Sequence, residues 1–358
     1  AESLAKHGEI DAANWLLNYA THIEAGVDNF PTWIEQKELA MKLVQEAVMQ
    51  YKAGKFKAAI LPWEQALSIF RTTQNRDREG ETLGNLSVIY ISLGNYDKAV
   101  DYLKEFLSIT RETKNIGEEQ RALVHLGSVY IQLEEYNLAA MYCEQGLELA
   151  RKIQDRHGEG SALGNLGTIY KFLGNYTQAI DYHQQSLQIA YLLNDPLMQE
   201  RTLGNLGLVY EELKNYNEAI EYHQQSLTIA QRIQDIHGQS KTLGNLGHIY
   251  EARTDYIEAI NYYQQALVLA FEVGDVPWQQ KLIENLNSAT QKLVEKGVEH
   301  INTNHPETAI LYLQKALTIY QELEYSLGEA VVLHELSLAF HVLKEHTTAI
   351  EYSQQSIV

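Results

Sequence analysis

Apolar residues recur along the chain at the spacing of an α-helix, in two successive runs separated by a turn. In residues 160–199, the apolar side chains of the first run lie in one arc of a helical wheel: Leu163, Leu166, Ile169, Tyr170 and Leu173. The second run, from Tyr176 to about Leu193, has the same spacing. Between them stands Gly174-Asn175, and glycine readily takes the left-handed conformation found just past a helix C-terminus. The pattern predicts two amphipathic helices, A and B, joined by a short turn.

This helix pair repeats every forty residues without slippage, in five well-matched copies over residues 79–278. Its clearest element is Leu-Gly-Asn-Leu-Gly, which begins at Leu163, Leu203 and Leu243 and has looser copies at Leu83 and Leu123. A residue that suits a helix N-cap precedes each next A helix: Asn115, Asp155, Asp195, Asp235 and Asp275. A fixed period of this length is typical of a solenoid, in which each repeat packs on its neighbours. We therefore expect an all-α solenoid of helix pairs.

Small and aromatic residues recur at positions where the two helices of a repeat must meet. Glycines in helix A and alanines in helix B predict a close helix approach: Gly127, Gly167, Gly207 and Gly247, with Ala139, Ala179, Ala219 and Ala259. Tyrosines recur at three positions, such as Tyr170, Tyr176 and Tyr182, and predict inter-helix packing rather than an aromatic cage. One helix B position holds Cys143, His183, His223 and Tyr263, which we interpret as packing residues rather than a reactive thiol or metal ligands.

These glycine, tyrosine and alanine positions in helix–turn–helix units resemble the tetratricopeptide repeat (TPR) over residues 39–358. The forty-residue form with Asn-Leu-Gly is similar to the arrays of kinesin light chains and LGN/Pins adaptors, and to cyanobacterial repeat arrays. The resemblance implies a right-handed α-α superhelix of about eight TPR units, with an N-terminal helical cap and a concave face that binds partners.

The resemblance and the period together predict four segments. We expect a helical cap over residues 1–38, six units over 39–278 with the first degenerate, an atypical unit with a ten-residue insertion over 279–328, and a truncated unit over 329–358. Because the chain stops inside the last helix B, we expect the natural protein to continue beyond it.

Two of these segments carry more specific predictions. In the cap, Asp11–Ala25 and Trp33–Met49 have helical patterns separated by a break at Asn29-Phe30-Pro31. In the atypical unit, Lys281–Ile301 contains one glycine and no proline, which predicts one long helix A and a local change of superhelical path.

Composition limits the classes of partner and site. The formal net charge of −19 opposes unassisted binding to nucleic acid or to an anionic membrane surface. A single cysteine excludes an intramolecular disulfide, and no apolar run approaches the roughly 20 residues of a membrane span, so we expect a cytoplasmic protein. His334-Glu335 is followed by His341, which is the wrong spacing for a zincin, and the glycine-rich pentamers lie inside helices. We expect no enzyme activity, no metal and no cofactor.

Polar residues opposite the packing arc of helix A form the candidate binding site. They comprise an asparagine-rich row, Asn85, His125, Asn165, Asn205 and Asn245, and nearby basic or polar residues, Arg121, Arg201, Lys241, Thr168, Lys171 and His248. A carboxamide donates and accepts hydrogen bonds at once, so such a row can hold the backbone of an extended peptide, as the resembling adaptors do. The basic residues suit a ligand that carries carboxylates. Two alternatives remain open: the asparagines hydrogen-bond a neighbouring helix, or the basic residues are solvated surface charge.

The predicted function is a non-enzymatic protein–protein interaction scaffold that binds a peptide segment of a partner in its concave groove. One form of this hypothesis has an acidic peptide as the ligand. A second hypothesis is the sensory or regulatory region of a larger bacterial signalling protein whose effector domain is absent from this chain. Self-association is a third.

Overall fold

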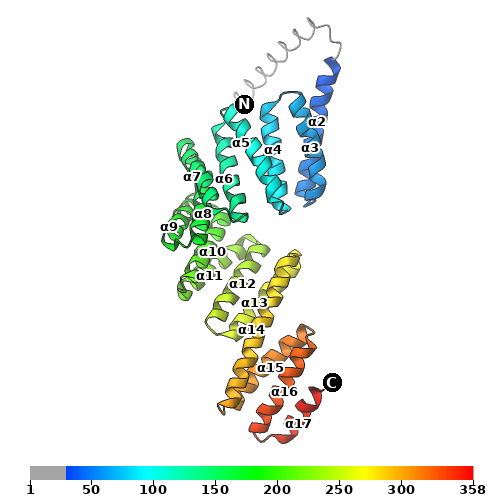
Figure 1. Cartoon of the computed structure of the whole chain (residues 1–358), viewed down its shortest axis with the longest axis vertical. Helices are drawn as coiled ribbons and strands as arrows, with labels where there is room; N and C mark the ends of the chain where they lie inside the picture. Colours follow the sequence, from blue (N-terminus) through cyan, green and yellow to red (C-terminus); the bar gives the residue numbers. More distant parts are fainter. Residues whose placement is uncertain (1–29, 358) are drawn as a thin grey trace. The chain divides into compact units, whose positions relative to one another are not determined.

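The computed structural model describes residues 30–357, and these residues form sixteen α-helices and no strand (Figure 1). Consecutive helices pair through short turns, so the predicted all-α fold of helix hairpins is confirmed. The first helices are α2 Phe30–Lys52, α3 Phe56–Thr72, α4 Arg76–Ser92, α5 Tyr96–Glu112, α6 Ile116–Gln132, α7 Tyr136–Ile153 and α8 Arg156–Phe172. They are followed by α9 Tyr176–Leu192, α10 Pro196–Glu212, α11 Tyr216–Ile233, α12 Ile236–Ala252 and α13 Tyr256–Val273. The last are α14 Val276–Asn302, α15 Pro306–Glu322, α16 Ser326–Val342 and α17 His346–Gln355.

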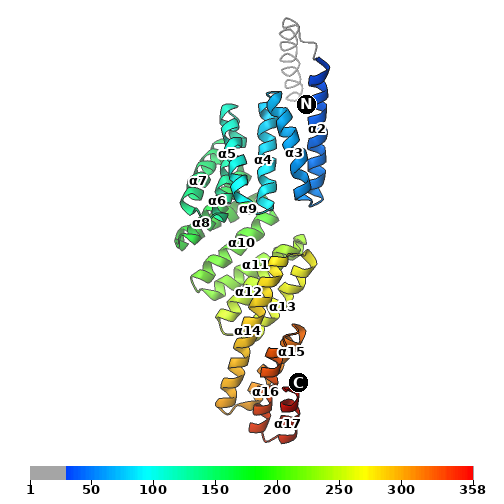
Figure 2. The same cartoon turned by 45° about the vertical axis from the view of Figure 1, so that its right-hand side comes forward.

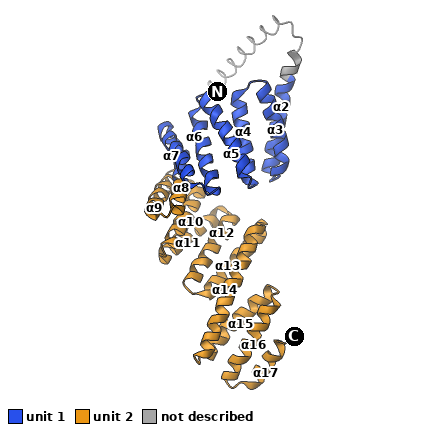
Figure 3. Ribbon diagram, viewed as in Figure 1, with its two compact units in different colours: residues 1–165 blue, residues 166–358 orange. Residues whose placement is uncertain are grey.

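The helices group into two compact units, which Figure 3 colours separately. Unit 1 comprises residues 1–165 and unit 2 comprises residues 166–358, with the boundary inside α8. The predicted division into a cap, six regular units, an atypical unit and a truncated unit stays a prediction.

The predictions for the two unusual segments have different outcomes. The helix at Trp33–Met49 is confirmed as part of α2, but the break at Asn29-Phe30-Pro31 is wrong in part, because α2 already begins at Phe30. Proline is compatible with the first turn of a helix, where its missing N–H has no partner to lose. The predicted helix at Asp11–Ala25 lies outside the described residues. The long helix is confirmed as α14, with 27 residues against 17 in α12, while the change of superhelical path stays a prediction.

Capping side chains begin the A helices as the sequence predicts. In α10 the side chain of Asp195 accepts a hydrogen bond from the Met198 backbone N–H at 3.0 Å, and Asp235 does the same for Gly238 at 2.9 Å. The same bond occurs at the other predicted caps, Asn115, Asp155 and Asp275. These bonds satisfy N–H groups that have no partner within the helix, and they fix where each A helix begins.

The predicted close approach of helices A and B at these glycines is confirmed, and the side chain that each glycine faces stands at another recurring position of helix B. A Cβ atom on Gly207 would lie 2.6 Å from His223 Nε2, and one on Gly127 would lie 2.2 Å from Cys143 Sγ. Gly167 faces His183 and Gly247 faces Tyr263 in the same way. The glycines therefore make room for the residue at this B-helix position, which we call the inter-helix position.

Tyrosine pairs complete the contact between helices A and B. Five pairs stack with ring centroids 5.2–5.5 Å apart: Tyr90 with Tyr102, Tyr130 with Tyr142, Tyr170 with Tyr182, Tyr210 with Tyr222, and Tyr250 with Tyr262. Each pair joins the two helices of one hairpin, so the prediction of tyrosine packing is confirmed. Such contacts stabilise aromatic pairs by about 0.5–1.5 kcal/mol beyond burial.

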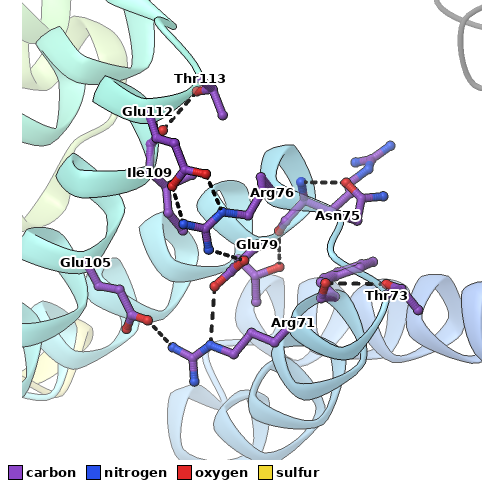
Figure 4. A network of polar contacts seen from close by, with 12 residues as sticks. Arg71, Thr73, Asn75, Arg76, Glu79, Glu105, Ile109, Glu112 and Thr113 are labelled. Atoms are coloured by element: carbon purple, nitrogen blue, oxygen red, sulfur yellow. Dashed lines mark hydrogen bonds and ion pairs between the residues drawn. The ribbon is translucent and has the colours of Figure 1, made fainter. Parts of the chain in front are cut away.

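Within unit 1, ion pairs join one hairpin to the next (Figure 4). Glu79 on α4 is almost fully buried, and its carboxylate accepts hydrogen bonds from Arg76 Nη1 at 2.8 Å and Arg71 Nε at 3.4 Å. The two arginines also contact Glu105 and Glu112 on α5. Equivalent pairs recur later in unit 1: Arg111 with Glu119, and Arg151 and Arg156 with Glu159. Buried and half-buried carboxylates thus fix successive hairpins of unit 1 through arginines at helix ends.

Candidate functional site

The predicted site residues are divided between the two units. Unit 1 holds Asn85 on α4, Arg121 and His125 on α6, and Asn165 on α8. The others belong to unit 2: Thr168 and Lys171 on α8, Arg201 and Asn205 on α10, and Lys241, Asn245 and His248 on α12. All lie on A helices, and each unit is described by itself below.

In unit 1, part of the predicted row interacts within the protein. Asn165 Nδ2 donates a hydrogen bond of 3.4 Å to the Val124 carbonyl on α6, which is the stack-supporting role left open by the sequence. Arg121 pairs with Glu118 at 2.8 Å. His125 is half-buried, and this burial, followed by the charge of Arg121, lowers its pKa to about 4, so the imidazole is neutral at neutral pH. Asn85 is exposed.

In unit 2, three A helices lie side by side, α10 against α12 and α12 against α14 (Figures 1 and 2). Arg201 is exposed on α10, and no ion pair of its guanidinium is found among residues 30–357. Asn205 on α10 and Asn245 on α12 are half-buried at the same place in their repeats. Unit 2 therefore presents carboxamides and a cation from neighbouring helices.

Lys241 has two neighbours close to the start of α14. Its Nζ lies 3.7 Å from Asp275 Oδ2 and 3.9 Å from the centroid of the Trp278 ring. Burial lowers the pKa of Lys241, and Asp275 opposes that shift. The indole of Trp278 is itself fixed, because its Nε1 donates to Ser240 Oγ at 3.0 Å. The ammonium group of Lys241 is thus held over a rigid aromatic ring.

Carboxylates further along the A helices join α10, α12 and α14. Glu211 on α10 contacts His248 Nδ1 on α12, and this hydrogen bond raises the pKa of His248. Glu251 on α12 accepts hydrogen bonds from Ser288 Oγ at 3.1 Å and Lys292 Nζ at 2.8 Å, both on α14.

A third donor reaches Glu251 from α13. Tyr263 OH donates to Glu251 Oε2 at 2.8 Å. Burial raises the pKa of Glu251, but the bonds from Lys292, Tyr263 and Ser288 outweigh it and lower the pKa overall. The contacts of Glu251 thus join α12 to both α13 and α14.

The two predicted residues on α8 are partly covered. Lys171 is half-buried, with its Nζ 4.4 Å from the centroid of the Phe172 ring. Burial lowers its pKa, while Glu212 and Glu211 oppose the shift. Thr168 is also half-buried.

Two residues of the same surface were missed by the sequence reasoning. Asn285 on α14 stands forty residues after Asn245, and Lys281 stands forty residues after Lys241. The signal is present, because Ile283-Glu284-Asn285-Leu286 matches Leu243-Gly244-Asn245-Leu246 in register. The apparent break of the period after Trp278 hides it, although the extra residues of α14 follow this match. We call Asn205, Asn245 and Asn285 the asparagine row, and Arg201, Lys241 and Lys281 the basic row.

The rest of the described chain adds two observations. Within residues 30–357, no three His, Cys, Asp or Glu side chains are grouped so that they could hold a metal ion. None of the helices described there has the length and apolar character that a membrane crossing requires.

Comparisons with known proteins identify the repeat. Sequence models of the tetratricopeptide repeat match residues 80–113, 118–191 and 199–270, which together make up about half of the 358 residues. No curated protein matches the chain.

Solved structures share the fold at low identity. A Rap protein complexed with competence and sporulation factor is 16% identical, with a TM-score of 0.56 and 95% of each chain covered. The apo form of the quorum sensor NprR from B. thuringiensis is 14% identical, with a TM-score of 0.53, 98% of this chain covered and 94% of that one. A signal transduction ATPase with numerous domains and a tetratricopeptide repeat sensor, from Pyrococcus horikoshii, is 18% identical, with a TM-score of 0.54. In that comparison 86% of this chain is covered and 46% of the other.

Proposed function

Because the chain belongs to the tetratricopeptide repeat family, we propose that it is a non-enzymatic interaction scaffold that binds a peptide segment of a partner protein along its A helices. In this proposal the carboxamides hold the backbone of the segment, and neighbouring basic residues contact its carboxylates. The asparagine and basic rows of unit 2 form the binding surface of this proposal, and the predicted residues of unit 1 stay a separate prediction.

The observation that carries the proposal is the register of the two rows on α10, α12 and α14. Asn205, Asn245 and Asn285 recur once per A helix, and these helices are neighbours. A carboxamide can accept from a peptide N–H and donate to a peptide C=O, so one asparagine per helix matches the repeating groups of an extended backbone. An extended segment has unpaired backbone groups along its whole length, which makes it the ligand that this row suits best.

Charge supports a ligand with carboxylates. In a chain of net charge −19, Arg201 is an exposed cation without an ion pair among residues 30–357. Arg121 in unit 1 and Lys241 in unit 2 already contact carboxylates of the protein. Surface pairs of this kind stabilise by only about 0–1 kcal/mol, so a ligand carboxylate can replace the internal partner.

The names of two structural relatives support a role in recognition. Their names describe a quorum sensor and a Rap protein complexed with a factor. Both cover nearly the whole of this chain, so a similar helical fold occurs in proteins of similar size whose names describe binding.

A display library of random peptides tests the proposal. We expect the full chain to enrich peptides whose affinity, measured by calorimetry, falls about tenfold or more in the variant Asn205→Ala plus Asn245→Ala, since each lost hydrogen bond in a desolvated contact contributes about 1 kcal/mol. The matched control is Asn217→Ala plus Asn261→Ala, which removes two asparagines from the B helices α11 and α13. Equal effects of the two variants, or a library that yields no binder, would overturn the proposal.

A second candidate, a sensory region within a larger signalling protein, is favoured by the relative with a tetratricopeptide repeat sensor, of which this chain spans 46%. A sensor changes conformation when it binds, whereas a scaffold does not need to. Small-angle scattering with and without the enriched peptide separates the two: a change in radius of gyration supports the sensor, and an unchanged curve supports the scaffold.

A further inference from the structure

We infer that α13 and the first half of α14 carry a second binding surface, which takes a basic amphipathic helix of a partner protein. The surface follows from the extra length of α14 and does not depend on the proposed peptide surface of the A helices. In the regular hairpins, the same place is filled by the hairpin's own B helix. In the α14–α15 hairpin, that helix lies further along α14 and leaves its usual place open.

The displaced B helix is α15, which lies beside the second half of α14 (Figures 1 and 2). Gly247 faces Tyr263 in the α12–α13 hairpin, and Gly297 faces Leu313 in the α14–α15 hairpin. Tyr263 and Leu313 are each the eighth residue of their B helices. Gly247 is the twelfth residue of α12, however, whereas Gly297 is the twenty-second residue of α14. Helix α15 therefore begins ten residues further along than a regular B helix, which corresponds to about 15 Å of helix length.

The first half of α14 has lost the cover that its equivalents have. The fifth residue of each of the five preceding A helices is buried: Gly80, Gln120, Gly160, Glu200 and Ser240. This residue packs on the hairpin's own B helix, as where Ser240 Oγ donates to the Ala266 carbonyl at 2.7 Å. The equivalent residue of α14, Gln280, is exposed. Three residues later, Ile283 is half-buried, whereas the leucine at this place in the five preceding A helices is buried.

The C-terminal half of α13 is uncovered in the same way. In unit 1, Glu64, the ninth residue of α3, accepts a hydrogen bond of 3.3 Å from Tyr102, the seventh residue of α5. In unit 2, Gln264, the ninth residue of α13, donates at 2.7 Å to Glu322, the last residue of α15. The nine residues of α13 that follow Gln264 therefore extend past the end of α15.

Apolar residues stand on this uncovered part of α13. Val268 is 67% exposed and Phe271 is 59% exposed, and they follow Gln264 on one face of the helix. The five preceding B helices have polar residues at the place of Val268: Ser68, Ser108, Glu148, Gln188 and Thr228. In unit 1 the place of Phe271 is taken by arginines, and Arg71 of α3 contacts Glu105 on the next B helix, α5. The face that elsewhere meets the next B helix is thus apolar and open on α13, as interaction sites are.

The open parts of α13 and α14 form one surface, because the two helices are neighbours joined by a short turn. We call Val268, Phe271, Val276, Gln280 and Ile283 the uncovered face. Val276, at the start of α14, is 65% exposed. Ile283 stands two residues from Lys281 and two from Asn285, so it points to the other side of α14 from both rows. The surface is long enough for a partner helix of about ten residues, or three turns.

Carboxylates border the uncovered face and decide the charge of its partner. Glu272 stands one turn after Val268, Glu284 stands one turn after Gln280, and Glu322 ends α15 beside Gln264, and all three glutamates are exposed. Lys281 offsets one of them, because its Nζ lies 3.9 Å from Glu284. A helix with an apolar stripe flanked by Lys or Arg complements this surface. A second copy of this chain, with a net charge of −19, would be repelled.

A labelled synthetic helix tests the inference. The probe is a peptide of about 14 residues, held helical by a side-chain staple, with a stripe of Leu and Ala flanked by Lys and Arg. Its binding to the full chain is followed by fluorescence anisotropy. We expect it to bind about tenfold tighter than a peptide of the same composition in scrambled order, or than one with Glu in place of Lys and Arg. Equal binding of the scrambled peptide, or no binding of the probe, would overturn the inference.

Paired variants locate the bound helix. Val268→Thr plus Phe271→Gln copies the residues that α11 has at these places, and it should weaken the probe about tenfold or more. The matched control, Tyr191→Gln plus Leu192→Thr, removes two exposed apolar residues from α9 and should leave the affinity nearly unchanged. Equal effects of the two variants would show non-specific attraction and would also overturn the inference.

Two further measurements separate the inference from its alternatives. Asn205→Ala plus Asn245→Ala should leave the affinity for the probe unchanged, so the proposed function and this inference can fail independently. A loss as large as that caused by Val268→Thr plus Phe271→Gln would place the probe on the A-helix surface and overturn the inference. Light scattering of the full chain should show no dimer that depends on Val268 and Phe271. A dimer that their replacement dissociates would make a second copy the occupant and would overturn the inference too.

Discussion

Units 1 and 2 use the same backbone hairpin but stabilise the junction between hairpins differently. At the residue that ends the first turn of each A helix, unit 1 has glutamates bound by arginines, as at Glu79 (Figure 4) and at Glu159. In unit 2, α10, α12 and α14 have glutamines there, and each donates to a backbone carbonyl of the preceding B helix: Gln199 to Ala190 at 3.1 Å, Gln239 to Ala230 at 3.3 Å and Gln279 to Ala270 at 2.9 Å. The junctions of unit 1 are therefore charged, and those before α10, α12 and α14 are neutral.

The residue at the inter-helix position also differs between the units, and here the more readily titrated side chains belong to unit 2. Helices α5 and α7 of unit 1 fill it with Leu103 and Cys143, while α9, α11 and α13 of unit 2 fill it with His183, His223 and Tyr263 and α15 returns to leucine, Leu313. Both histidines are fully buried, and neither ring nitrogen of either one has a hydrogen-bond partner in the described part of the chain. Unit 2 therefore has neutral junctions and a titratable core, whereas unit 1 has charged junctions and a less titratable core. In unit 1 most arginines serve structure, while in unit 2 Arg201 and the lysines of the basic row remain on the surface.

The largest expected effect is on the acid sensitivity of unit 2. Burial lowers the pKa of His183 and of His223 from 6.5 to about 4. The unfolded chain therefore binds protons that the fold excludes, and the free energy of unfolding falls as the pH drops from 6.5 toward 4. The loss reaches about 3 kcal/mol for each histidine.

The variant His183→Leu plus His223→Leu, which copies Leu103 of unit 1, should flatten this decline. Denaturant unfolding at several pH values measures it. His125 also has a lowered pKa and stays in the variant, so a smaller slope remains. An unchanged slope would show that the two buried imidazoles do not set the pH dependence.

The second largest expected effect is on stability, when a methyl group is added beside the inter-helix position. Gly207→Ala should lower the free energy of unfolding by about 1–3 kcal/mol, because the new methyl group would lie 2.6 Å from the His223 ring. Gly204→Ala in the same helix is the control, since its Cβ would meet Ser226 Oγ at an ordinary 3.5 Å. That change should stabilise by about 0.5–1 kcal/mol through helix propensity. Similar effects of both alanines on thermal unfolding would contradict the packing account.

A junction exchange tests the first comparison directly. Gln199→Glu should destabilise by about 2 kcal/mol, because a nearly buried carboxylate then faces the Ala190 carbonyl without a cation. Tyr191 occupies the place that Arg111 and Arg151 hold in unit 1. Adding Tyr191→Arg should restore most of the loss by rebuilding the charged junction. A double variant no more stable than the single one, in urea unfolding, would mean that the two junctions are not interchangeable.

The smallest expected effects concern the turns. Gly174 has φ +75°, and Lys214 takes φ +59° at the equivalent turn of the next repeat. Gly174→Ala should destabilise by about 1 kcal/mol and Lys214→Gly should change stability by less, because glycine also gains entropy in the unfolded chain. Thermal unfolding measures both, and a stabilising Gly174→Ala would contradict this account of the turn.

The sequence predicted the hairpins and their close approach because both depend on local periodicity and on small residues. It did not predict which side chain faces Gly207, since alanine and histidine recur with the same period on helix B and only the geometry separates them. The exchange of glutamate for glutamine at the junction could be read from the sequence, but the partners of these side chains, eight or nine residues earlier on the preceding B helix, could not. The resemblance to kinesin light chains and LGN/Pins adaptors stays a prediction.

The candidate site was predictable only in part. Periodicity placed Asn205 and Lys241 on one face of their helices, but it missed Asn285 and Lys281 because the longer α14 hid the register. Contacts that decide availability, such as Lys241 over Trp278 or Asn165 with the Val124 carbonyl, join residues far apart in sequence and follow from packing alone.

Hydrogen–deuterium exchange of the full chain, free and saturated with the tightest library peptide, tests the central claim most directly. A peptide bound along the A helices of unit 2 should slow amide exchange in α10, α12 and α14 and leave α11 and α13 unchanged. Protection confined to the B helices, or to unit 1, would contradict the account.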